Sequence, residues 1–477
     1  MKRLPHISFI LVLLALIILL YSATRGLTYH DEGYILNSAY RMIQGEVPYR
    51  DFHFAYTPLA IFITSLFYEI GNVSVISERF AAICISLLSL SCLYYLAGKT
   101  IKNKWIQALV LLGFVVWGPL HINFVWPVML AISFSLAMMV CLYLAKEKHN
   151  LFFLSCAGVF MVLTFLSKQN FGLAGFFILI LTLYLLKPAA KKEGLLYLIP
   201  GILVTVLLFL LYLLLTSSYI PFVNDFLSYT VQRIVISHSL TTPFIYPSSV
   251  PVMIIKTCIY MIPLVLGFAT LLRGKTNPFV GSIGIYTVLF YLLGIRPTTD
   301  YIHLVPLLAI AALPLGILAD RTHTKIGICV LFLFAVVGFM RGFYTNYYKW
   351  EAPLSSQNIL LKIPSSDIYT SAKISSEVTS VSEYARSKHI KSLFIYEYAP
   401  LFYLLSGSRN PTPYDLIDQS DFYKPYQQEI IHILTEKRTN TIITGYSVFE
   451  DTTEIGRYIK QTYSIHKVLH DHIVWIK

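Results

Sequence analysis

The sequence predicts an all-α polytopic membrane protein with a small α/β domain at its C-terminus. Three observations support this fold class. The chain of 477 residues is 56% hydrophobic and only 13% charged, with a mean hydropathy of +0.65, whereas soluble proteins contain about 25% charged residues. Apolar runs of about 20 residues, which is enough to cross a bilayer, recur as far as residue 343. Beyond that point the composition is mixed and the charges balance.

About eleven apolar runs fit transmembrane helices. They cover residues 7–23, 77–98, 105–120, 127–145, 151–167, 171–186, 195–216, 250–272, 279–295, 304–319 and 326–343. The first run follows Met-Lys-Arg and has no convincing cleavage site after it. We therefore expect a retained span rather than a removed signal peptide.

The net charge of +12 reports membrane orientation and not a nucleic-acid partner. With a cytoplasmic N-terminus, the cytoplasmic segments hold fourteen Lys and Arg residues against three acids. The tail from residue 344 holds fourteen of each sign. Because short loops rich in Lys and Arg stay inside, we expect an integral plasma (inner) membrane protein whose C-terminal domain is extracytoplasmic.

The first outer loop, about residues 24–77, carries two short helical patterns. Residues 57–71 are apolar but too short for an ordinary span, and counting them as one would move the basic loops outside. We expect a re-entrant or interfacial helix there. Apolar residues at helical spacing between Ile35 and Ile43, followed by Gly45, predict a second interfacial helix.

The chain divides into a membrane domain, residues 1–343, and a soluble α/β domain, residues 344–477. The expected elements of the soluble domain are two helices and three strands, over residues 375–389, 422–437, 392–398, 441–445 and 464–476. Residues 217–249 look like a second long outer loop. All six cysteines fall within predicted spans, so we interpret them as packing residues rather than disulfide partners or metal ligands.

Two adjacent carboxylates, Asp31 and Glu32, stand at the mouth of this apolar protein. One interpretation is structural, since Asp is a common N-cap and an amphipathic helix begins here. The other is chemical, because a carboxylate can accept the proton of a hydroxyl that attacks a sugar. A second acid nearby helps to tune its pKa. The two interpretations are compatible.

Lys168 lies in a three-residue polar hinge between two spans, on the predicted outer side. A lysine that extends its ammonium group from a helix end to the interface is the structural alternative. Basic residues are disfavoured on the outer side, however. Flanked by Gln169 and Asn170, Lys168 suits a departing phosphate, whose charge it would neutralise.

Arg296, Asp300 and His303 lie together in a later outer loop. An Arg–Asp surface pair of little energetic value is the structural alternative, and His303 then sits at the membrane interface. In the functional interpretation, the planar guanidinium of Arg296 is a second phosphate ligand, and Asp300 or His303 orients it.

Four residues of the first loop are expected to shape a sugar or acceptor pocket: Tyr34, Arg50, Asp51 and His53. A turn stabilised by local charge pairing is the alternative for the last three. Carboxylates also suit Mg²⁺ or Mn²⁺, so a divalent cation stays open, although no spacing here demands a metal.

An odd number of predicted spans precedes each of Asp31, Lys168 and Arg296, so all three are expected on the same side of the membrane. Unrelated polar residues in separate loops would scatter over both faces. Transfer of a sugar from a lipid phosphate requires an acid and cations together on one face.

The first loop also resembles a known pattern. It resembles the first-loop pattern of the dolichyl-phosphate-mannose protein mannosyltransferase superfamily in the order Asp31-Glu-Gly-Tyr, Ala39, Gly45, Pro48-Tyr-Arg-Asp-Phe and Pro58-Leu. That superfamily includes the aminoarabinose transferases that modify lipid A. Arg79-Phe-Ala-Ala at the start of the second span matches that group too. The resemblance covers about residues 1–320 in hydropathy and order, and the first loop is its specific part.

This resemblance implies a GT-C membrane glycosyltransferase, with an outer active site, a polyprenyl-phosphate sugar donor and inversion at the anomeric carbon. It makes Asp31 the catalytic base and Glu32 its neighbour, while Lys168 and Arg296 match the donor-phosphate ligands only loosely. The tail does not match a mannosyltransferase ectodomain. The acceptor therefore stays open among envelope lipids, glycans and proteins, and membrane lipids are the other expected partners.

Two other classes compete with this hypothesis. A transporter or flippase of lipid-linked sugars usually places ionisable residues in the middle of its spans, and these spans are nearly free of them; Lys256, near an outer end, is the main exception. A membrane glycan polymerase or ligase shares the donor chemistry but lacks the acid pair of the first loop.

Overall fold

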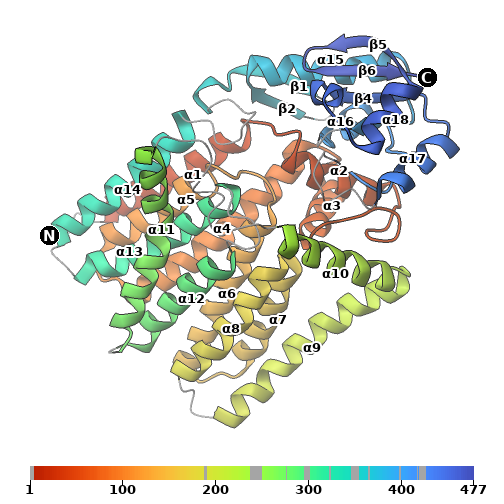
Figure 1. The fold of residues 1–477 in the computed structure, drawn as a ribbon. Coiled ribbons are helices and arrows are strands. Elements are labelled where there is room, and N and C mark those ends of the chain that lie inside the picture. Colours follow the sequence, from red (N-terminus) through yellow and green to blue (C-terminus); the bar gives the residue numbers. More distant parts are fainter. Residues whose placement is uncertain are drawn as a thin grey trace.

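A computed structural model describes residues 5–186, 191–236, 250–275, 277–294, 301–321, 324–344, 354–363, 366–396, 399–415, 417 and 426–477. It contains a bundle of long helices and a smaller unit of helices and strands at one end of that bundle (Figure 1). We call the second part, residues 354–477, the α/β unit. The predicted fold class, a helical membrane protein with a small C-terminal α/β region, is confirmed.

Each predicted span coincides with a helix. These helices are α1 (Pro5–Ala23), α4 (Val75–Thr100), α5 (Lys104–Trp117), α6 (Pro127–Lys148), α7 (Phe152–Ser167), α8 (Gln169–Leu186), α9 (Lys191–Leu215), α11 (Val250–Arg273), α12 (Pro278–Gly294), α13 (Tyr301–Arg321) and α14 (Thr324–Tyr344). Within the described residues, α4, α6, α9, α13 and α14 are long and apolar enough to cross a membrane, as expected of an integral membrane protein. That the shorter ones also cross stays a prediction.

The outer face of α9 is apolar. Leu208 and Leu215 on this helix are 63% and 77% exposed, and α9 lies at the edge of the bundle (Figure 1). A water-soluble protein rarely leaves such a face uncovered. This surface therefore fits contact with the acyl chains of lipids.

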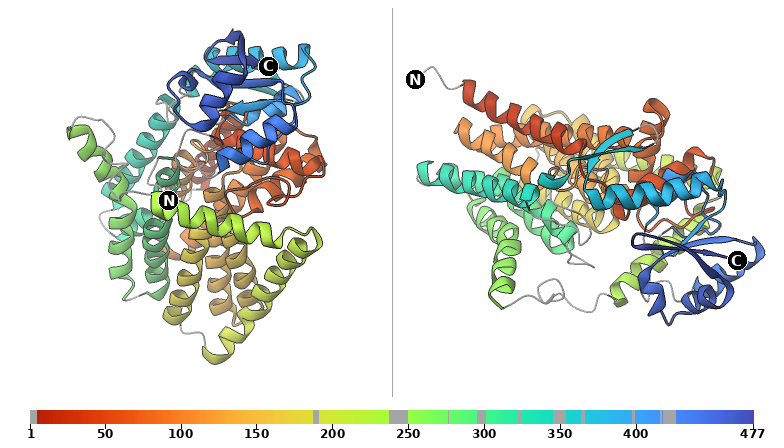
Figure 2. Two further views of the ribbon diagram at one scale, coloured as in Figure 1. Left: turned by 45° about the vertical axis from the view of Figure 1, so that its right-hand side comes forward. Right: turned by 90° about the horizontal axis from the view of Figure 1, so that it is seen from above.

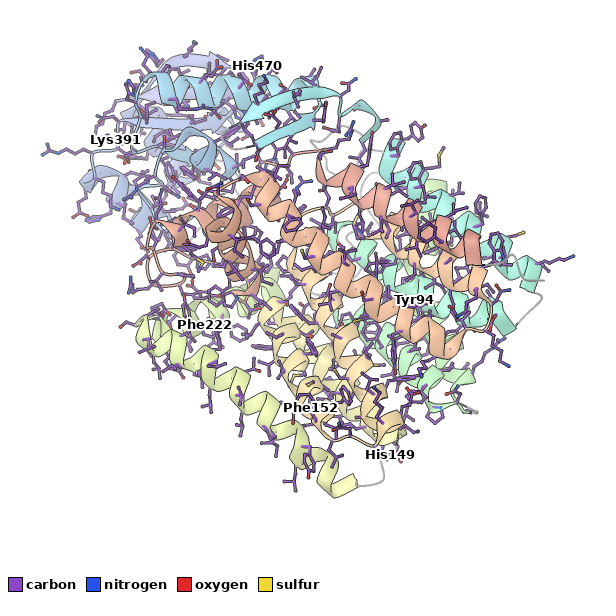
Figure 3. All side chains as sticks on the ribbon, turned by 180° about the vertical axis from the view of Figure 1, so that it is seen from behind. Tyr94, His149, Phe152, Phe222, Lys391 and His470 are labelled. Carbon is purple, nitrogen blue, oxygen red and sulfur yellow. The ribbon has the colours of Figure 1, made fainter. Side chains whose placement is uncertain are left out.

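The basic loops gather at the end of the bundle remote from the α/β unit. There Lys99 pairs with Glu147, and Asp320 accepts hydrogen bonds from backbone N–H groups of residues 102–103 at 2.8 and 3.0 Å. His149 marks this end, far from the α/β unit (Figure 3). The segments around residues 99–103, 147–149 and 320, which the charge pattern assigns to one side, thus lie at the same end of the bundle.

The first loop forms both predicted helices, α2 (Asp31–Ile43) and α3 (Leu59–Gly71). Gly45 follows α2 with a φ of +90°, a conformation that favours glycine, so its role as a stop signal is confirmed. Figure 2 shows this loop in red and orange directly beside the α/β unit.

The second long loop expected over residues 217–249 contains a helix that was not predicted, α10 (Tyr219–Ile236), and residues 237–249 lie outside the described residues. Phe222 and Phe226 are one helical turn apart, and their ring centroids are 5.7 Å from each other. Phe222 also contacts Phe209 of α9 and Tyr49 of the first loop, at 5.3 and 5.0 Å. This aromatic packing holds α10 against both.

The α/β unit contains a two-stranded sheet and a four-stranded sheet of order β3-β4-β6-β5. Its elements are β1 (Ile359–Ile363), β2 (Ser366–Thr370), α15 (Ala372–Ser387), β3 (Phe394–Tyr396), α16 (Leu401–Ser406), α17 (Gln427–Glu436), β4 (Thr441–Gly445), α18 (Glu454–Thr462), β5 (Ser464–Leu469) and β6 (His472–Ile476). Only β3 and β4 are parallel. The single strand predicted over residues 464–476 is wrong, because the chain reverses at His470, with φ +54°, into a β5–β6 hairpin.

The first loop and the α/β unit share one hydrophobic core. Leu36 and Ala39 of α2 lie in the same buried cluster as Val378 of α15 and Phe402 of α16. The helices approach so closely that a Cβ added to Gly33 would lie 2.7 Å from the backbone nitrogen of Leu401. The α/β unit therefore covers the apolar face of the helix that carries the acid pair.

Candidate active site

The acid pair opens helix α2. The helix begins at Asp31, and the residue before it, His30, makes no capping hydrogen bond through its side chain. Asp31 is therefore not the N-cap that the structural interpretation expected. Its side chain is half-buried, whereas that of Glu32 is fully buried. The two neighbours thus occupy different environments.

Glu32 is held by a buried ion pair. Arg79 Nε donates to Glu32 Oε1 at 2.5 Å, and the backbone N–H of Thr28 donates to Oε2 at 3.2 Å. The other two nitrogens of Arg79 donate to the carbonyl oxygens of Arg25 and Gly26, at 3.2 and 2.9 Å. One guanidinium group thereby fixes the acid pair to the end of α1, as its planar array of five donors allows.

The connection between α5 and α6 packs against this region. The Asn123 side chain donates to the carbonyl oxygens of Ser22 and Arg25, at 2.5 and 2.8 Å. The backbone N–H of Val125 donates to the buried carboxylate of Glu78. These contacts bring a third segment of the chain to the acid pair.

Lys168 is almost fully buried, with 5% of its surface exposed. Its Nζ lies 5.8 Å from the ring centroid of Tyr56 in the first loop and 5.7 Å from that of Phe171. The Thr57 hydroxyl donates to the Phe165 carbonyl at 2.8 Å and so joins the first loop to the end of α7. The ammonium group thus lies near one aromatic ring of the first loop and one of α8.

Tyr56 links the first turn of α2, which begins with Asp31, to Lys168. Tyr34 lies one helical turn after Asp31, on the same face of α2. Its ring centroid is 6.5 Å from that of Tyr56, whose ring lies beside the Lys168 ammonium group. The first turn of α2, which carries Asp31 and Tyr34, is therefore linked through Tyr56 to Lys168, although the two segments are far apart in the sequence.

The start of α13 reaches the same cluster. His303 is buried, and its ring lies 6.4 Å from that of Trp126, which in turn lies 5.7 Å from Tyr56. Arg296 and Asp300 lie outside the described residues. The Asn170 side chain donates to the carbonyl oxygen of Leu293 at 2.9 Å, so the end of α12 lies beside the Lys168 hinge.

The remaining expected pocket residues mainly stabilise the first loop. The Tyr34 hydroxyl accepts from the Ala55 N–H at 2.9 Å and donates to the His53 carbonyl at 3.5 Å. His53 Nδ1 lies 2.9 Å from Asp225 Oδ2 on α10. This second contact joins the loop to a helix that the sequence did not predict.

Arg50 and Asp51 pair with each other. Two Arg50 nitrogens donate to the Asp51 carboxylate at 3.0 and 2.8 Å, and this hydrogen bonding lowers the pKa of Asp51 below its ordinary value. Asp51 also accepts from the Val47 N–H at 2.7 Å, and Arg50 donates to the Thr216 carbonyl at 3.0 Å. These contacts are those of a turn stabilised by local pairing and attached to the end of α9.

Sequence reasoning missed a second ion pair, between Arg41 of α2 and Asp415 of the α/β unit. The two side chains lie 3.1 Å apart and are nearly inaccessible to solvent. Burial opposes the charge of Arg41, but Asp415 and then Glu46 raise its pKa above the ordinary value. This pair attaches α2 to the unit that covers it.

No group of three or more His, Cys, Asp or Glu side chains that could hold a metal ion occurs among the described residues.

These features define a polytopic membrane protein with an acid-bearing interfacial helix beneath an α/β unit. No protein-family model and no curated protein matches the chain. ArnT from Cupriavidus metallidurans bound to undecaprenyl phosphate matches with a TM-score of 0.62 and 13% identity, over 99% of this chain and 98% of its own. Its apo structure matches with a TM-score of 0.61 and 14% identity, over 98% and 97%. The oligosaccharyltransferase AglB from Archaeoglobus fulgidus gives a TM-score of 0.45 and 10% identity, over 92% and 70%.

The likeness to ArnT spans nearly the whole of both chains. This chain therefore has the GT-C fold in the form seen in ArnT, and the resemblance inferred from the first loop is confirmed at the level of fold.

Proposed function

We propose that this protein is an inverting glycosyltransferase that moves a sugar from a polyprenyl-phosphate carrier to a hydroxyl group of an envelope lipid, glycan or protein. The observation that carries the proposal is the contact of Tyr56 with both Lys168 and Tyr34, which stands one helical turn after Asp31. This arrangement supplies a carboxylate and a cation at one end of a membrane bundle. ArnT, which shares the fold, was solved with undecaprenyl phosphate bound, and this supports the donor class.

In the proposed reaction Asp31 accepts the proton of the acceptor hydroxyl as its oxygen attacks the anomeric carbon. The bond between that carbon and the phosphate oxygen breaks with inversion, and polyprenyl phosphate leaves with both electrons of the bond. Lys168 neutralises the charge that grows on the leaving phosphate. Arg296 is the proposed second phosphate ligand.

Glu32 has a supporting role in this proposal. The hydrogen bonds from Arg79 and from the Thr28 N–H hold its carboxylate in place, so it orients the start of α2, where Asp31 lies.

We further propose that the cluster lies on the extracytoplasmic side of the plasma membrane, with the N-terminus in the cytoplasm. Residues 1–343 are the proposed membrane domain and residues 344–477 the proposed extracytoplasmic domain. The gathering of Lys99, the 102–103 loop and His149 at the opposite end of the bundle supports this orientation.

The test is transfer by the purified protein in lipid nanodiscs. Polyprenyl-phosphate sugars are supplied with an envelope extract, and release of free polyprenyl phosphate is measured by mass spectrometry. We expect release that depends on the extract, and envelope glycans from a deletion strain should lack the same sugar. Movement of intact lipid-linked sugar across vesicles, without release, would favour a flippase instead.

Lys168→Ala should weaken use of the donor about tenfold or more, as expected for loss of a hydrogen bond to a charged group. Lys102→Ala, which removes an exposed lysine at the opposite end of the bundle, is the matched control and should leave donor use unchanged. Equal donor kinetics in both variants would remove Lys168 from the phosphate site.

A further inference from the structure

Trp126 occupies the centre of the cluster that joins the first loop to α13. It is the residue before α6 and is 1% exposed. Its ring meets Tyr56 edge-on at 5.7 Å, with an interplanar angle of 74°, and it lies 6.4 Å from His303. The indole is therefore held in place from two sides.

The indole N–H of Trp126 has no hydrogen-bond acceptor among the described residues. The other buried tryptophans in that part of the chain are satisfied. Trp117 Nε1 donates to the Phe334 carbonyl at 2.9 Å, and Trp475 Nε1 donates to the Thr444 hydroxyl at 2.9 Å. A buried donor without a partner opposes folding, and such groups often mark sites where a ligand supplies the missing atom.

The surroundings of this N–H favour an anionic acceptor. Tyr56 is near both Trp126 and Lys168: its ring centroid lies 5.7 Å from that of Trp126 and 5.8 Å from Lys168 Nζ. A hydrogen-bond donor and a cation thus both lie beside one ring. A tetrahedral anion offers several acceptor oxygens in different directions, so it can engage both groups, and each charge-assisted bond is stronger than a neutral one.

We propose that the Trp126 indole N–H donates a hydrogen bond to a phosphate oxygen of the polyprenyl-phosphate donor, while Lys168 contacts another oxygen of the same group. Trp126 is then a specificity-determining residue, because it recognises the phosphate and not the lipid chain. The inference rests on the proposed function. It adds a hydrogen-bond donor to the phosphate site, one that sequence patterns did not indicate.

The experiment compares Trp126→Phe with Trp117→Phe in lipid nanodiscs. Both variants lose one indole N–H and keep an aromatic ring. Trp126→Phe should weaken binding of undecaprenyl phosphate about tenfold or more without lowering the unfolding temperature, because the lost N–H had no protein partner. Trp117→Phe should lower the unfolding temperature and leave binding unchanged, since it deprives the Phe334 carbonyl of its donor.

Undecaprenol, which lacks the phosphate, separates the head group from the chain. Wild type and Trp126→Phe should bind undecaprenol equally. Inorganic phosphate should compete with undecaprenyl phosphate in the wild type and less well in Trp126→Phe. The double variant Trp126→Phe/Lys168→Ala should lose less than the product of the single losses, because groups that contact one ligand atom cluster are coupled.

Three results would overturn the inference. Unchanged binding of undecaprenyl phosphate by Trp126→Phe would refute the proposed hydrogen bond but would not contradict the proposed function. Equal weakening of undecaprenol binding assigns the effect to the shape of the ring and not to the N–H. A wild-type protein that binds no undecaprenyl phosphate refutes the proposed donor and the subsite together.

Discussion

Arg79 and Glu32 form a buried ion pair, in which Nε donates to Oε1 at 2.5 Å. The pair gives the two adjacent acids different roles. Glu32 is bound on both oxygens and shielded from solvent, whereas Asp31, at the first position of α2, is half-buried. Stability and chemistry should therefore separate cleanly between neighbouring residues.

Glu32→Gln should destabilise the protein. It breaks the shorter of the two buried ion pairs of Arg79 and leaves only Glu78, 3.8 Å from Nε, as a counter-charge; losing one partner of a buried pair costs about 3–5 kcal/mol. Thermal unfolding in detergent measures the loss. Glu147→Gln is the control, because its pair with Lys99 is exposed and should contribute little. Equal unfolding temperatures for the two variants would contradict a structural role for Glu32.

Asp31→Asn should abolish sugar transfer while the protein still inserts and unfolds as the wild type does. The amide keeps the shape of the side chain but cannot accept the acceptor's proton, and loss of a general base costs about 10²–10⁴-fold in rate. The matched control is Glu69→Gln, an exposed acid at the end of α3 in the same loop. Transfer by Asp31→Asn at the rate of this control would exclude Asp31 as the base.

Gly33→Ala should separate α2 from the α/β unit. The new methyl group would lie 2.7 Å from both the Cβ and the backbone nitrogen of Leu401, and such overpacking costs about 1–3 kcal/mol. Both thermal stability and kcat should fall, because the helix that carries Asp31 must shift. Gly98→Ala, in α4 with open space around it, should keep activity and gain about 0.5–1 kcal/mol.

The pH dependence of stability should carry a contribution from Glu377 in α15. Burial raises the pKa of this carboxyl above its ordinary 4.5, although Lys373 and His472 oppose the rise. The folded state therefore holds the proton more tightly than the unfolded state. The stability that Glu377 contributes is present below pH 4.5 and is lost as the pH rises through the folded pKa.

Glu377→Gln should remove this loss, so its advantage in unfolding temperature over the wild type should grow as the pH rises above 4.5. Asp471→Asn is the contrasting variant. The hydrogen bond from Lys373 lowers the pKa of Asp471 below 3.8, so its contribution is lost as the pH falls. Parallel unfolding curves for wild type and Glu377→Gln between about pH 4 and 8 would contradict the assignment.

The helices of the bundle could be predicted because each is an apolar run. The assignment of their ends to the two sides of the membrane rests on charge alone. Strand β4, residues 441–445, was predicted with its observed bounds because it too is a local run of β-branched and apolar residues. The hairpin at residues 464–476 was not, because His470 and Asp471 form its turn without glycine, proline or asparagine. Helix α10 was not predicted because its apolar residues are interrupted by polar ones, such as Asn224, Asp225 and Gln232.

The partners within the site could not be predicted. Asp31, Lys168 and His303 were proposed from residue type and loop position, and the structure links Lys168 and His303 through Tyr56 and Trp126. Arg79 lies 47 residues from Glu32, and Asp415 lies 374 residues from Arg41. Neither spacing follows any local period. Trp126 looked like one more aromatic residue at a span boundary, and only its orphaned N–H distinguishes it.

The hydrophobic core shared by the first loop and the α/β unit has a consequence for biosynthesis. Helix α2 leaves the ribosome near the start of translation, yet Val378, Leu401 and Phe402, which cover its apolar side, are made more than three hundred residues later. The bundle inserts in the meantime. The proposed catalytic centre is therefore completed last, after the final helices and strands have been synthesised, and a prematurely terminated chain would insert yet stay inactive.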